Sequence, residues 1–467
     1  MAPKFGTSGL RGLVVELTPE LVAAHVAAFI AACPTGTGLF VGRDLRPSSP
    51  RIAADVIAAG RACGLAVTDC GALSTPALAL AAMRAGAGAV MVTGSHIPAD
   101  RNGLKFYLPS GEISKADEAA ILAALSTPGA PSGAEGPLAT APHAGAEYVA
   151  RYGAAFGPDA LAGLRLGLYE HSSVARDLLA ELLTALGAEV VRLARSETFI
   201  PVDTEAVAPE TRADLKAWCA AQGLDAVLST DGDADRPLLT DATGLVVPGD
   251  VLGVLSARAL GAEVICTPVS SNAMVAEIPE FRALHLTKIG SPFVIAAMEA
   301  ALAADPSAKV VGFEANGGFL LGFEAKAPAG PLPALMTRDA VLPIVAPLVA
   351  ARAAGQSLAA AVAALPARFT AADRLTEMPT EASAAFLASL RAEAATRAAF
   401  LAPLGQETAL DNTDGLRISL EGGRVVHLRP SGNAPEFRVY VEAETREDAQ
   451  ELLNMAMAMV TRALAAC

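Results

Sequence analysis

The chain has 467 residues and a formal net charge of −14, from 35 Lys and Arg against 49 Asp and Glu. A surface this negative argues against nucleic acid or anionic membranes as partners. No apolar run reaches the ~18 uninterrupted residues that a membrane-spanning helix needs. The N-terminal segment lacks the apolar core of a signal peptide and the cysteines lack CxxC spacing, so we expect reduced thiols and a cytoplasmic location. The cysteines are Cys33, Cys63, Cys70, Cys219, Cys266 and Cys467.

Three stretches share one order of predicted elements: a strand, a turn containing serines, a helix and a second strand. Serines before a helix are favourable N-caps. A repeated strand-helix-strand unit predicts similar α/β domains, and we expect three of them, each with a mixed sheet. The stretches are 38–70, 165–193 and 263–289, with helices predicted at 50–62, 174–186 and near 273–278.

The tail, 370–467, has a different pattern. It contains a helix, two strands within 414–428 joined by a turn at 421–423, a strand at 436–443 and a final helix at 446–465. Strands and helices segregated in this way predict a smaller α+β domain.

Breaks in the pattern predict the domain boundaries. A stretch rich in Pro, Gly, Ser and Ala at 126–145 indicates a linker, and further boundaries fall near 242–248 and 365–372. The length is consistent with three domains or more, at about 100–200 residues each. The predicted domains are 1–141, 142–243, 244–366 and 367–467.

Ser95 is the first candidate for a reacting group. An apolar run at 87–92 predicts a buried strand, and Pro98 prevents a helix from running through the segment that follows. Ser95 is therefore expected on an exposed turn at the carboxyl end of a strand, where α/β sheets bind ligands. With His96 beside it and Lys105 ten residues on, its hydroxyl is a candidate nucleophile. By itself the segment fits an ordinary polar turn equally well.

Three carboxylates alternate in a loop after the predicted strand 226–228: Asp231, Asp233 and Asp235. Unneutralised, they would repel one another, so they predict a divalent cation held by oxygen ligands. An EF-hand is excluded because Arg236 stands where that loop needs Gly and Ala242 where it needs Glu. With only three carboxylates, the loop leaves room for a phosphate oxygen and favours Mg²⁺.

A second polar loop, 429–438, follows the predicted strand 425–428. It offers a guanidinium, a hydroxyl, an amide and an open backbone at Gly432, which together can bind phosphate. The same composition is also typical of an ordinary turn.

Five segments resemble those of the α-D-phosphohexomutases, the family that includes phosphomannomutases and phosphoglucomutases. The resemblance covers essentially the whole chain and implies three similar α/β domains and a smaller fourth domain around a central cleft. It also implies a reversible isomerase reaction, in which phosphoserine donates to a hexose monophosphate, the resulting 1,6-bisphosphate turns round, and its other phosphate returns to the serine. In the family's order, the segments are FGTSGLRG (5–12), TGSHIPADRNGLK (93–105), DGDADR (231–236), GFEANGG (312–318) and RPSGNAPEFR (429–438).

The resemblance assigns roles by matching position. Ser95 matches the phosphorylated serine, which also lends an oxygen to one Mg²⁺ per chain, and Asp231, Asp233 and Asp235 match the other metal ligands. Phosphoserine and three aspartates carry about −5, which one Mg²⁺ reduces to about −3 and nearby cations would nearly balance. The groups expected around the reacting phosphate are Arg11, His96, Lys105 and Arg236, with His96 or Lys105 as acid or base. The groups expected to bind substrate are Lys288, Glu314, Asn316, Arg429, Ser431, Gly432, Asn433 and Arg438.

The chain also departs from the family pattern. Asn316 stands where many members have Ser, and Gly318 stands where His is common. A second imidazole is absent near 287–292, where Lys288 and Ser291 are the candidate substitutes. Outside these motifs, Arg43 and Arg46 are ambiguous between a functional role and solvated arginines at the entry to a helix, and the solvated interpretation is slightly favoured.

The motifs together are most similar to those of bacterial phosphomannomutases. This implies interconversion of mannose 6-phosphate and mannose 1-phosphate, with a hexose 1,6-bisphosphate as primer. Glucose phosphates are the alternative or second substrates, because the two sugars differ only at C2. A metal-dependent sugar phosphatase and a non-enzymatic phosphosugar sensor are more remote alternatives. We expect a monomer or a weak dimer.

Overall fold

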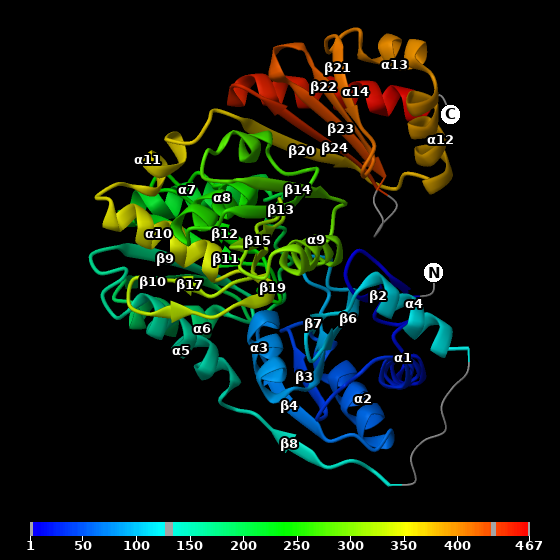
Figure 1. Ribbon diagram of the computed structural model, residues 1–467, viewed down its shortest axis with the longest axis vertical. Coiled ribbons are helices and arrows are strands. Elements are labelled where there is room, and N and C mark those ends of the chain that lie inside the picture. Colours follow the sequence, from blue (N-terminus) through cyan, green and yellow to red (C-terminus); the bar gives the residue numbers. More distant parts are fainter. Residues whose placement is uncertain (1–2, 127–133, 431–435, 466–467) are drawn as a thin grey trace.

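The computed structural model describes residues 3–126, 134–430 and 436–465. Its sheets are stacked along the long axis of the molecule (Figure 1): an N-terminal α/β domain at one end, two α/β domains in the middle, and a C-terminal α+β domain at the other end. This is the predicted architecture, and each α/β sheet is mixed, as expected.

The N-terminal sheet has the strand order β1-β2-β6-β5-β3-β4-β8, with β7 paired to β6. Its strands are β1 (Lys4–Phe5), β2 (Leu10–Leu13), β3 (Leu39–Arg43), β4 (Val67–Ala72), β5 (Gly88–Val92), β6 (Arg101–Leu108), β7 (Gly111–Glu112) and β8 (Leu138–Thr140). Its helices are α1 (Pro19–Ala32), α2 (Ser49–Ala62), α3 (Thr75–Ala85) and α4 (Lys115–Ala124).

The prediction of a linker at 126–145 is wrong in part. Strand β8 lies in this stretch and pairs in parallel with β4, because the edge of β4 offers unpaired backbone groups. The next helix, α5 (Ala144–Phe156), also begins inside it. Residues 127–133 lie outside the described part of the chain.

The second sheet has the order β10-β9-β11-β12 and the third β14-β13-β15-β16-β19. The second domain contains β9 (Arg165–His171), β10 (Glu189–Arg195), β11 (Ala226–Thr230), β12 (Pro237–Leu239), α5, α6 (Arg176–Ala185) and α7 (Pro209–Gln222). The strands of the third are β13 (Val264–Pro268), β14 (Ala283–Thr287), β15 (Val310–Phe313), β16 (Phe319–Leu321), β17 (Ala325–Lys326), β18 (Pro331–Leu332) and β19 (Leu335–Asp339). Its helices are α8 (Gly249–Ala259), the 3-10 turn η1 (Ala273–Glu277), α9 (Ser291–Ala304), α10 (Leu342–Ala353) and α11 (Leu358–Ala363).

The C-terminal sheet is antiparallel throughout, in the order β20-β24-β23-β22-β21. Its elements are β20 (Phe369–Leu375), α12 (Thr380–Ala392), α13 (Ala394–Leu401), β21 (Glu407–Asp411), β22 (Leu416–Leu420), η2 (Glu421–Gly423), β23 (Val425–Pro430), β24 (Phe437–Ala443) and α14 (Arg446–Ala465). The strands predicted within 414–443 and the final helix are confirmed. Strands β20 and β21 were not predicted.

The predicted functional loops occupy equivalent places in their sheets. Each one joins a strand to its antiparallel neighbour: β5 to β6, β11 to β12, β15 to β16 and β23 to β24. The first three of these loops begin at Thr93, Asp231 and Glu314, whereas residues 431–435, between β23 and β24, lie outside the described part of the chain. The three described loops therefore bring their motifs to the region where the α/β domains meet.

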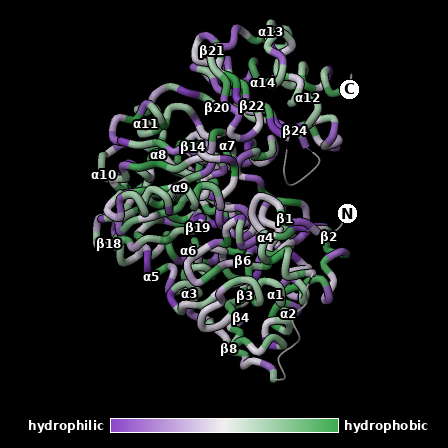
Figure 2. Tube along the Cα trace, turned by 45° about the vertical axis from the view of Figure 1, so that its right-hand side comes forward, coloured by the Kyte–Doolittle hydropathy of each residue, from purple (hydrophilic) through white to green (hydrophobic). Residues whose placement is uncertain are grey.

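The cores show how the domains are joined. One apolar cluster contains Leu78, Leu168 and Ile265, and so runs through all three α/β domains, whereas Phe437 belongs to a separate core in the C-terminal domain. Apolar segments, green in Figure 2, are spread over every domain. None of the described helices is long and apolar enough to cross a membrane.

Candidate active site

Ser95 lies at the junction of the first two domains and is fully buried, not exposed as its turn composition predicted. Its backbone is left-handed (φ +54°), a conformation that costs a non-glycine residue about 1–2 kcal/mol. Thr93 Oγ1 accepts a hydrogen bond from Ser95 N at 2.7 Å, and Ser95 Oγ donates to Asp231 Oδ2 at 2.5 Å. The packing of the second domain against the loop both buries the serine and provides the acceptor for its hydroxyl.

The acidic loop forms a compact buried cluster, because suitable oxygens of Asp231, Asp233 and Asp235 all lie within 4.8 Å of one another. Lys105 Nζ bridges two of them, at 2.6 Å from Asp233 Oδ2 and 2.5 Å from Asp235 Oδ2. The other oxygen of each of these two aspartates is buried without a hydrogen-bond partner. Unsatisfied, converging carboxylate oxygens fit a hard divalent cation such as Mg²⁺.

The two ends of this cluster differ in electrostatic environment. Burial and the charges of Asp233 and Asp235 raise the pKa of Asp231 well above its usual value. Burial opposes ionisation of Asp233 too, but Lys105, with help from a hydrogen bond from Thr75, lowers its pKa below the usual range. Without a metal, Asp231 is therefore protonated more readily than Asp233.

Cations also lie close to His96, the neighbour of the serine. Arg236 Nη1 lies 3.0 Å from His96 Nδ1, and because a guanidinium can only donate, this assigns Nδ1 as acceptor and the ring proton to Nε2. Burial and then the charges of Arg236 and Arg11 lower the pKa of His96 well below its usual value, so the imidazole is neutral. Arg438 and Lys105 contribute to the same shift.

Arg11 lies in β2, and desolvation of its guanidinium together with the charges of Arg236 and Arg338 lowers its pKa to about 10. A buried guanidinium facing like charges is stabilised when an anion binds. Together with Arg236, it forms a positive region beside Ser95.

Glu314 and Asn316, the residues predicted to contact the sugar, lie in the turn after β15, which we call the sugar loop. Glu314 is buried, and its Oε2 has no hydrogen-bond partner, although Arg338 Nη1 lies 3.5 Å away. This oxygen is therefore ready to accept a hydrogen bond from a ligand hydroxyl. Asn316 Oδ1 instead accepts from Gly318 N at 3.0 Å, so the amide oxygen shapes the turn.

The C-terminal domain brings two of its predicted residues toward the site. Arg438 acts on His96 from β24, as stated above. Arg429 Nε donates to Asp414 Oδ1 at 2.9 Å, and Asp414 Oδ2 accepts from Ile289 N of the third domain at 2.9 Å. The remaining residues predicted for this loop, Ser431, Gly432 and Asn433, lie outside the described part of the chain.

The two candidate substitutes for the missing imidazole differ in availability. Lys288 is exposed, with its ammonium over the ring of Phe293 at 5.9 Å from the centroid. Ser291 begins α9 and donates its hydroxyl to Glu112 at 2.6 Å. Lys288 can thus reach a ligand freely, whereas Ser291 is engaged in holding the first and third domains together.

Comparison with known proteins assigns the family. Sequence models described as phosphoglucomutase/phosphomannomutase alpha/beta/alpha domains I, II and III match residues 2–130, 146–244 and 248–369, and the C-terminal domain model matches 354–459. A phosphomannomutase of Sinorhizobium fredii is 45% identical, with 99% of this chain and 100% of that protein covered.

The chain belongs to the phosphoglucomutase/phosphomannomutase family. A phosphomannomutase of Salmonella muenchen is 41% identical over 98% of this chain and 95% of that protein. The fold is also that of a solved phosphoglucomutase/phosphomannomutase family protein from Burkholderia thailandensis, with a TM-score of 0.75, 21% identity, and coverage of 98% and 97% of the two chains. The four domains and their order are thus those of the family.

One residue in this family member that sequence reasoning missed is Arg338, at the end of β19. It is buried, with Nη2 2.9 Å from Asp235 Oδ2 and Nη1 3.5 Å from Glu314 Oε2. It therefore joins the acidic cluster to the sugar loop. A Cβ at Gly318 would lie 2.9 Å from Arg338 Cδ, so this arginine occupies space that a side chain at 318 would need. The one indication of this arrangement in the sequence was Gly318, which stands where many family members have His.

The interpretation of Arg46 as a solvated arginine is wrong. Its side chain is fully buried, because the loop after β5 folds over it and provides acceptors for the guanidinium. Arg43 is partly exposed, with Nη1 3.9 Å from Asp69 Oδ1.

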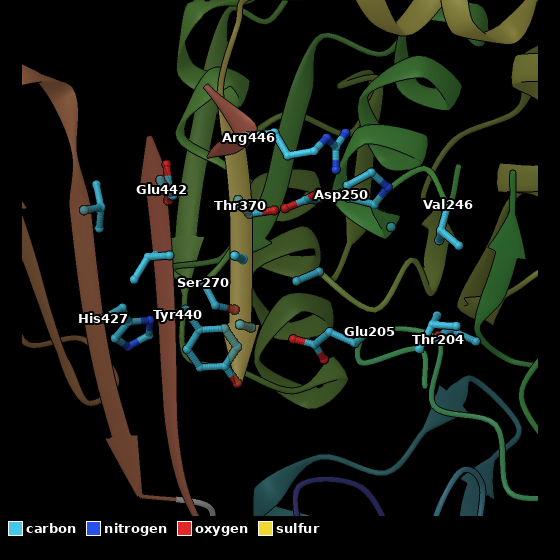
Figure 3. Close-up of a pocket in the computed structure, with 18 of the residues that line it drawn as sticks. Thr204, Glu205, Val246, Asp250, Ser270, Thr370, His427, Tyr440, Glu442 and Arg446 are labelled. Atoms are coloured by element: carbon cyan, nitrogen blue, oxygen red, sulfur yellow. The ribbon is translucent and has the colours of Figure 1, made fainter. Parts of the chain in front are cut away.

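A pocket of about 190 Å³ separates the C-terminal sheet from the second and third domains. Figure 3 shows Tyr440 and Glu442 of β24 on one side and Glu205 and Asp250 on the other. Asp250 accepts hydrogen bonds from Val251 N and Asn272 N. Burial nevertheless raises its pKa to about 7.

This shift predicts a pH-dependent stability. A carboxyl whose pKa is raised in the folded state holds its proton there up to a higher pH, so the free energy of unfolding falls as pH rises from about 4 to about 7. Between pH 5 and pH 7 the contribution is on the order of 2 kcal/mol. Denaturant unfolding of the wild type and of Asp250→Asn at pH 5, 6, 7 and 8 should give a shallower slope for the variant. Equal slopes for the two proteins would contradict the assignment.

Proposed function

We propose that the protein interconverts mannose 6-phosphate and mannose 1-phosphate through a phosphorylated Ser95 and a hexose 1,6-bisphosphate. The observation that carries this proposal is the placement of Ser95 Oγ, 2.5 Å from Asp231 Oδ2 and beside a region of buried cations. Phosphoryl transfer depends mainly on positioning and charge neutralisation, and this arrangement supplies both. The choice of mannose is supported by the phosphomannomutases with 45% and 41% identity.

The acidic cluster would hold the metal. Asp231, Asp233 and Asp235 supply oxygen ligands, and phosphorylated Ser95 supplies a further one. When bound, Mg²⁺ would neutralise part of the charge on the transferring phosphoryl group. Lys105, now paired with Asp233 and Asp235, then becomes available to that phosphoryl group.

The cationic residues and the neutral histidine would have different roles in the transfer. Arg11, Lys105 and Arg236 would stabilise the three oxygens of the transferring group. Acid or base assistance would come from His96 or Lys105. His96 is neutral with its proton on Nε2, so Nδ1, which now accepts from Arg236, is the nitrogen that would take the proton of the attacking sugar hydroxyl. In each half-reaction a sugar O–P bond forms as the Ser95 O–P bond breaks, or the reverse, so that phosphate is conserved on the enzyme.

The sugar would bind in the space between the loops of the third and fourth domains. Glu314 Oε2, which is buried without a hydrogen-bond partner, would accept from a sugar hydroxyl, with the neighbouring Asn316 as a further contact. Arg429 and Arg438 and the loop that contains Ser431, Gly432 and Asn433 would bind the phosphate that is not reacting, with Lys288 as an additional cation. These donors must serve both orientations of the bisphosphate, which favours charge recognition over a fit to one ring face.

Substrate preference is the direct test of this proposal. We expect kcat/KM for mannose 1-phosphate to exceed that for glucose 1-phosphate by about 10–100-fold, because the two sugars differ in one hydroxyl. Each should be measured with its own 1,6-bisphosphate as primer, alongside glucosamine 1-phosphate. A preference for glucosamine of about a hundredfold or more would overturn the mannose assignment and leave the mutase chemistry intact.

Two other activities make different predictions. A sugar phosphatase would release inorganic phosphate and need no bisphosphate primer, and a phosphosugar sensor would turn over nothing. Intact mass after incubation with the bisphosphate, with and without EDTA, followed by analysis of products, distinguishes them. Glu314 Oε2 has no hydrogen-bond partner, and Arg338 links this residue to Asp235 of the acidic cluster. This favours the mutase, since a phosphatase has no need to hold a sugar that turns round.

We also propose a cytoplasmic enzyme of carbohydrate metabolism that acts as a monomer or weak dimer, with neither nucleic acid nor membrane as partner. The net charge of −14 supports the exclusion of polyanions. The domain limits 1–141, 142–243, 244–366 and 367–467 are proposed with it, carrying the phosphoserine, metal, sugar and phosphate loops respectively.

A further inference from the structure

Arg46 lies directly beneath the loop that carries Ser95. Its guanidinium donates to successive main-chain carbonyls of that loop: Nη2 to Ser95 O at 2.8 Å and to Ile97 O at 2.5 Å, and Nη1 to Pro98 O at 2.7 Å and to Arg101 O at 3.0 Å. The side chain is 1% exposed. One buried cation therefore ties both ends of the loop together.

Asp44 completes this arrangement. Arg46 Nε lies 3.2 Å from Asp44 Oδ2, the same oxygen that accepts from Thr93 Oγ1 at 2.7 Å. Thr93 Oγ1 in turn accepts from Ser95 N. Every N–H of the Arg46 guanidinium thus has an acceptor, and the same ion pair orients the threonine that holds the serine backbone.

The second domain closes over the arginine. Arg46 Cζ lies 4.2 Å from the centroid of the Phe199 ring, in cation–π geometry. A Cβ on Gly232, between two of the acidic ligands, would lie 2.9 Å from Ser95 O and 3.2 Å from the Phe199 ring. A Cβ on Gly94 would lie 2.6 Å from Arg46 Cζ. The serine loop, the arginine and the acidic loop are therefore packed without space for adjustment.

We propose that Arg46 is a positioning residue for phosphoryl transfer, which holds Ser95 in its left-handed conformation with Oγ aimed at the acidic cluster. The inference rests on the proposed function. The five N–H donors of a guanidinium can serve four carbonyls and a carboxylate, whereas the compact ammonium of lysine has too few donors and a different shape. A displacement of about 1 Å at a reacting atom can lower a rate by about 10²-fold.

The experiment compares Arg46→Lys and Arg46→Ala with the wild type. We expect Arg46→Lys to lower kcat by about 10²-fold. The rate at which a hexose 1,6-bisphosphate phosphorylates Ser95, measured by intact mass, should fall by a similar factor of about 10². KM for the hexose phosphate should stay within about threefold, because the sugar-binding groups are on other domains. For Arg46→Ala, guanidinium ion in the assay should restore part of the lost rate by occupying the vacated space.

Arg176→Lys is the matched control, because Arg176 is also buried and donates to main-chain carbonyls, those of His171 and Ser196, away from the serine loop. It should keep the wild-type rate of phosphorylation. Hydrogen exchange of the amides at 93–101 should be faster in Arg46→Lys than in the wild type and unchanged in Arg176→Lys.

The outcomes separate this inference from the proposed function. A wild type that is phosphorylated at Ser95, with an Arg46→Lys rate equal to it, overturns the positioning role alone. A loss of rate that merely follows the unfolded fraction, without rescue by guanidinium, also overturns it. A wild type that bisphosphate never phosphorylates overturns the proposed function, and this inference with it.

Discussion

Ser95→Ala should lower mutase turnover by about 10⁴-fold or more, the scale on which removal of an essential nucleophile acts. The variant should also never gain the mass of a phosphoryl group after incubation with a hexose 1,6-bisphosphate. Because the hydroxyl is buried and donates to Asp231, the substitution should cost about 1–2 kcal/mol of stability, more than an exposed turn serine would. Steady-state kinetics, intact mass and denaturant unfolding measure these effects.

Ser256→Ala provides the control. Ser256 is buried in α8 and donates to Leu252 O at 2.7 Å, so its removal also deletes a buried hydroxyl but leaves the site untouched. It should be phosphorylated at Ser95 like the wild type. Peptide mapping that finds the phosphoryl group on any residue other than Ser95 would refute the assignment of the nucleophile.

Asp233→Asn should lower kcat by about 10²-fold or more. Changing a residue that only supports a metal ligand lowers activity by about 10–100-fold, and removing a ligand itself should have a larger effect. The substitution should also abolish most of the rise in melting temperature that Mg²⁺ gives the wild type. Without metal, the variant should be less stable than the wild type by about 1–3 kcal/mol, because Asp233 Oδ2 is an acceptor for Lys105 and Thr75.

This expectation about the metal-free protein reverses the one that the sequence alone supports. Three alternating aspartates indicate repulsion, which loss of one charge would relieve. Lys105 and Arg338 instead neutralise the cluster, so removal of a carboxylate leaves cations short of partners. Asp241→Asn, at a buried turn aspartate outside the cluster, should keep the stabilisation by Mg²⁺. An Asp233→Asn protein with wild-type Mg²⁺ dependence would exclude the acidic loop as the metal site.

The predictable part of the fold and the site is the part that depends on local sequence. Strand-turn-helix order predicted the α/β domains, and an apolar run followed by polar residues located the loops at Ser95 and Asp231. Strand β8 could not be predicted from the sequence, because its three residues form a strand by pairing with the edge of β4 and not through their own composition.

What could not be predicted is the effect of one domain on another. Ser95 and Arg46 have polar surroundings in the sequence, yet both are buried, because Phe199 and the acidic loop of the second domain pack over them. Arg338 lies outside every motif, and only the meeting of β19 with the acidic and sugar loops makes it a shared partner. Such roles depend on contacts between residues far apart in the chain, which no local pattern records.

The loops that begin at Thr93, Asp231 and Glu314 follow one another along the chain, and the C-terminal domain comes last. Domains fold largely from the N-terminus as the ribosome releases them. A nascent chain that has emerged through the second domain already contains the serine and the acidic cluster. The loops for the sugar and for the second phosphate come later. During synthesis the chain thus passes through a stage in which the serine and acidic loops have left the ribosome while the turn at Glu314 and the C-terminal domain have not.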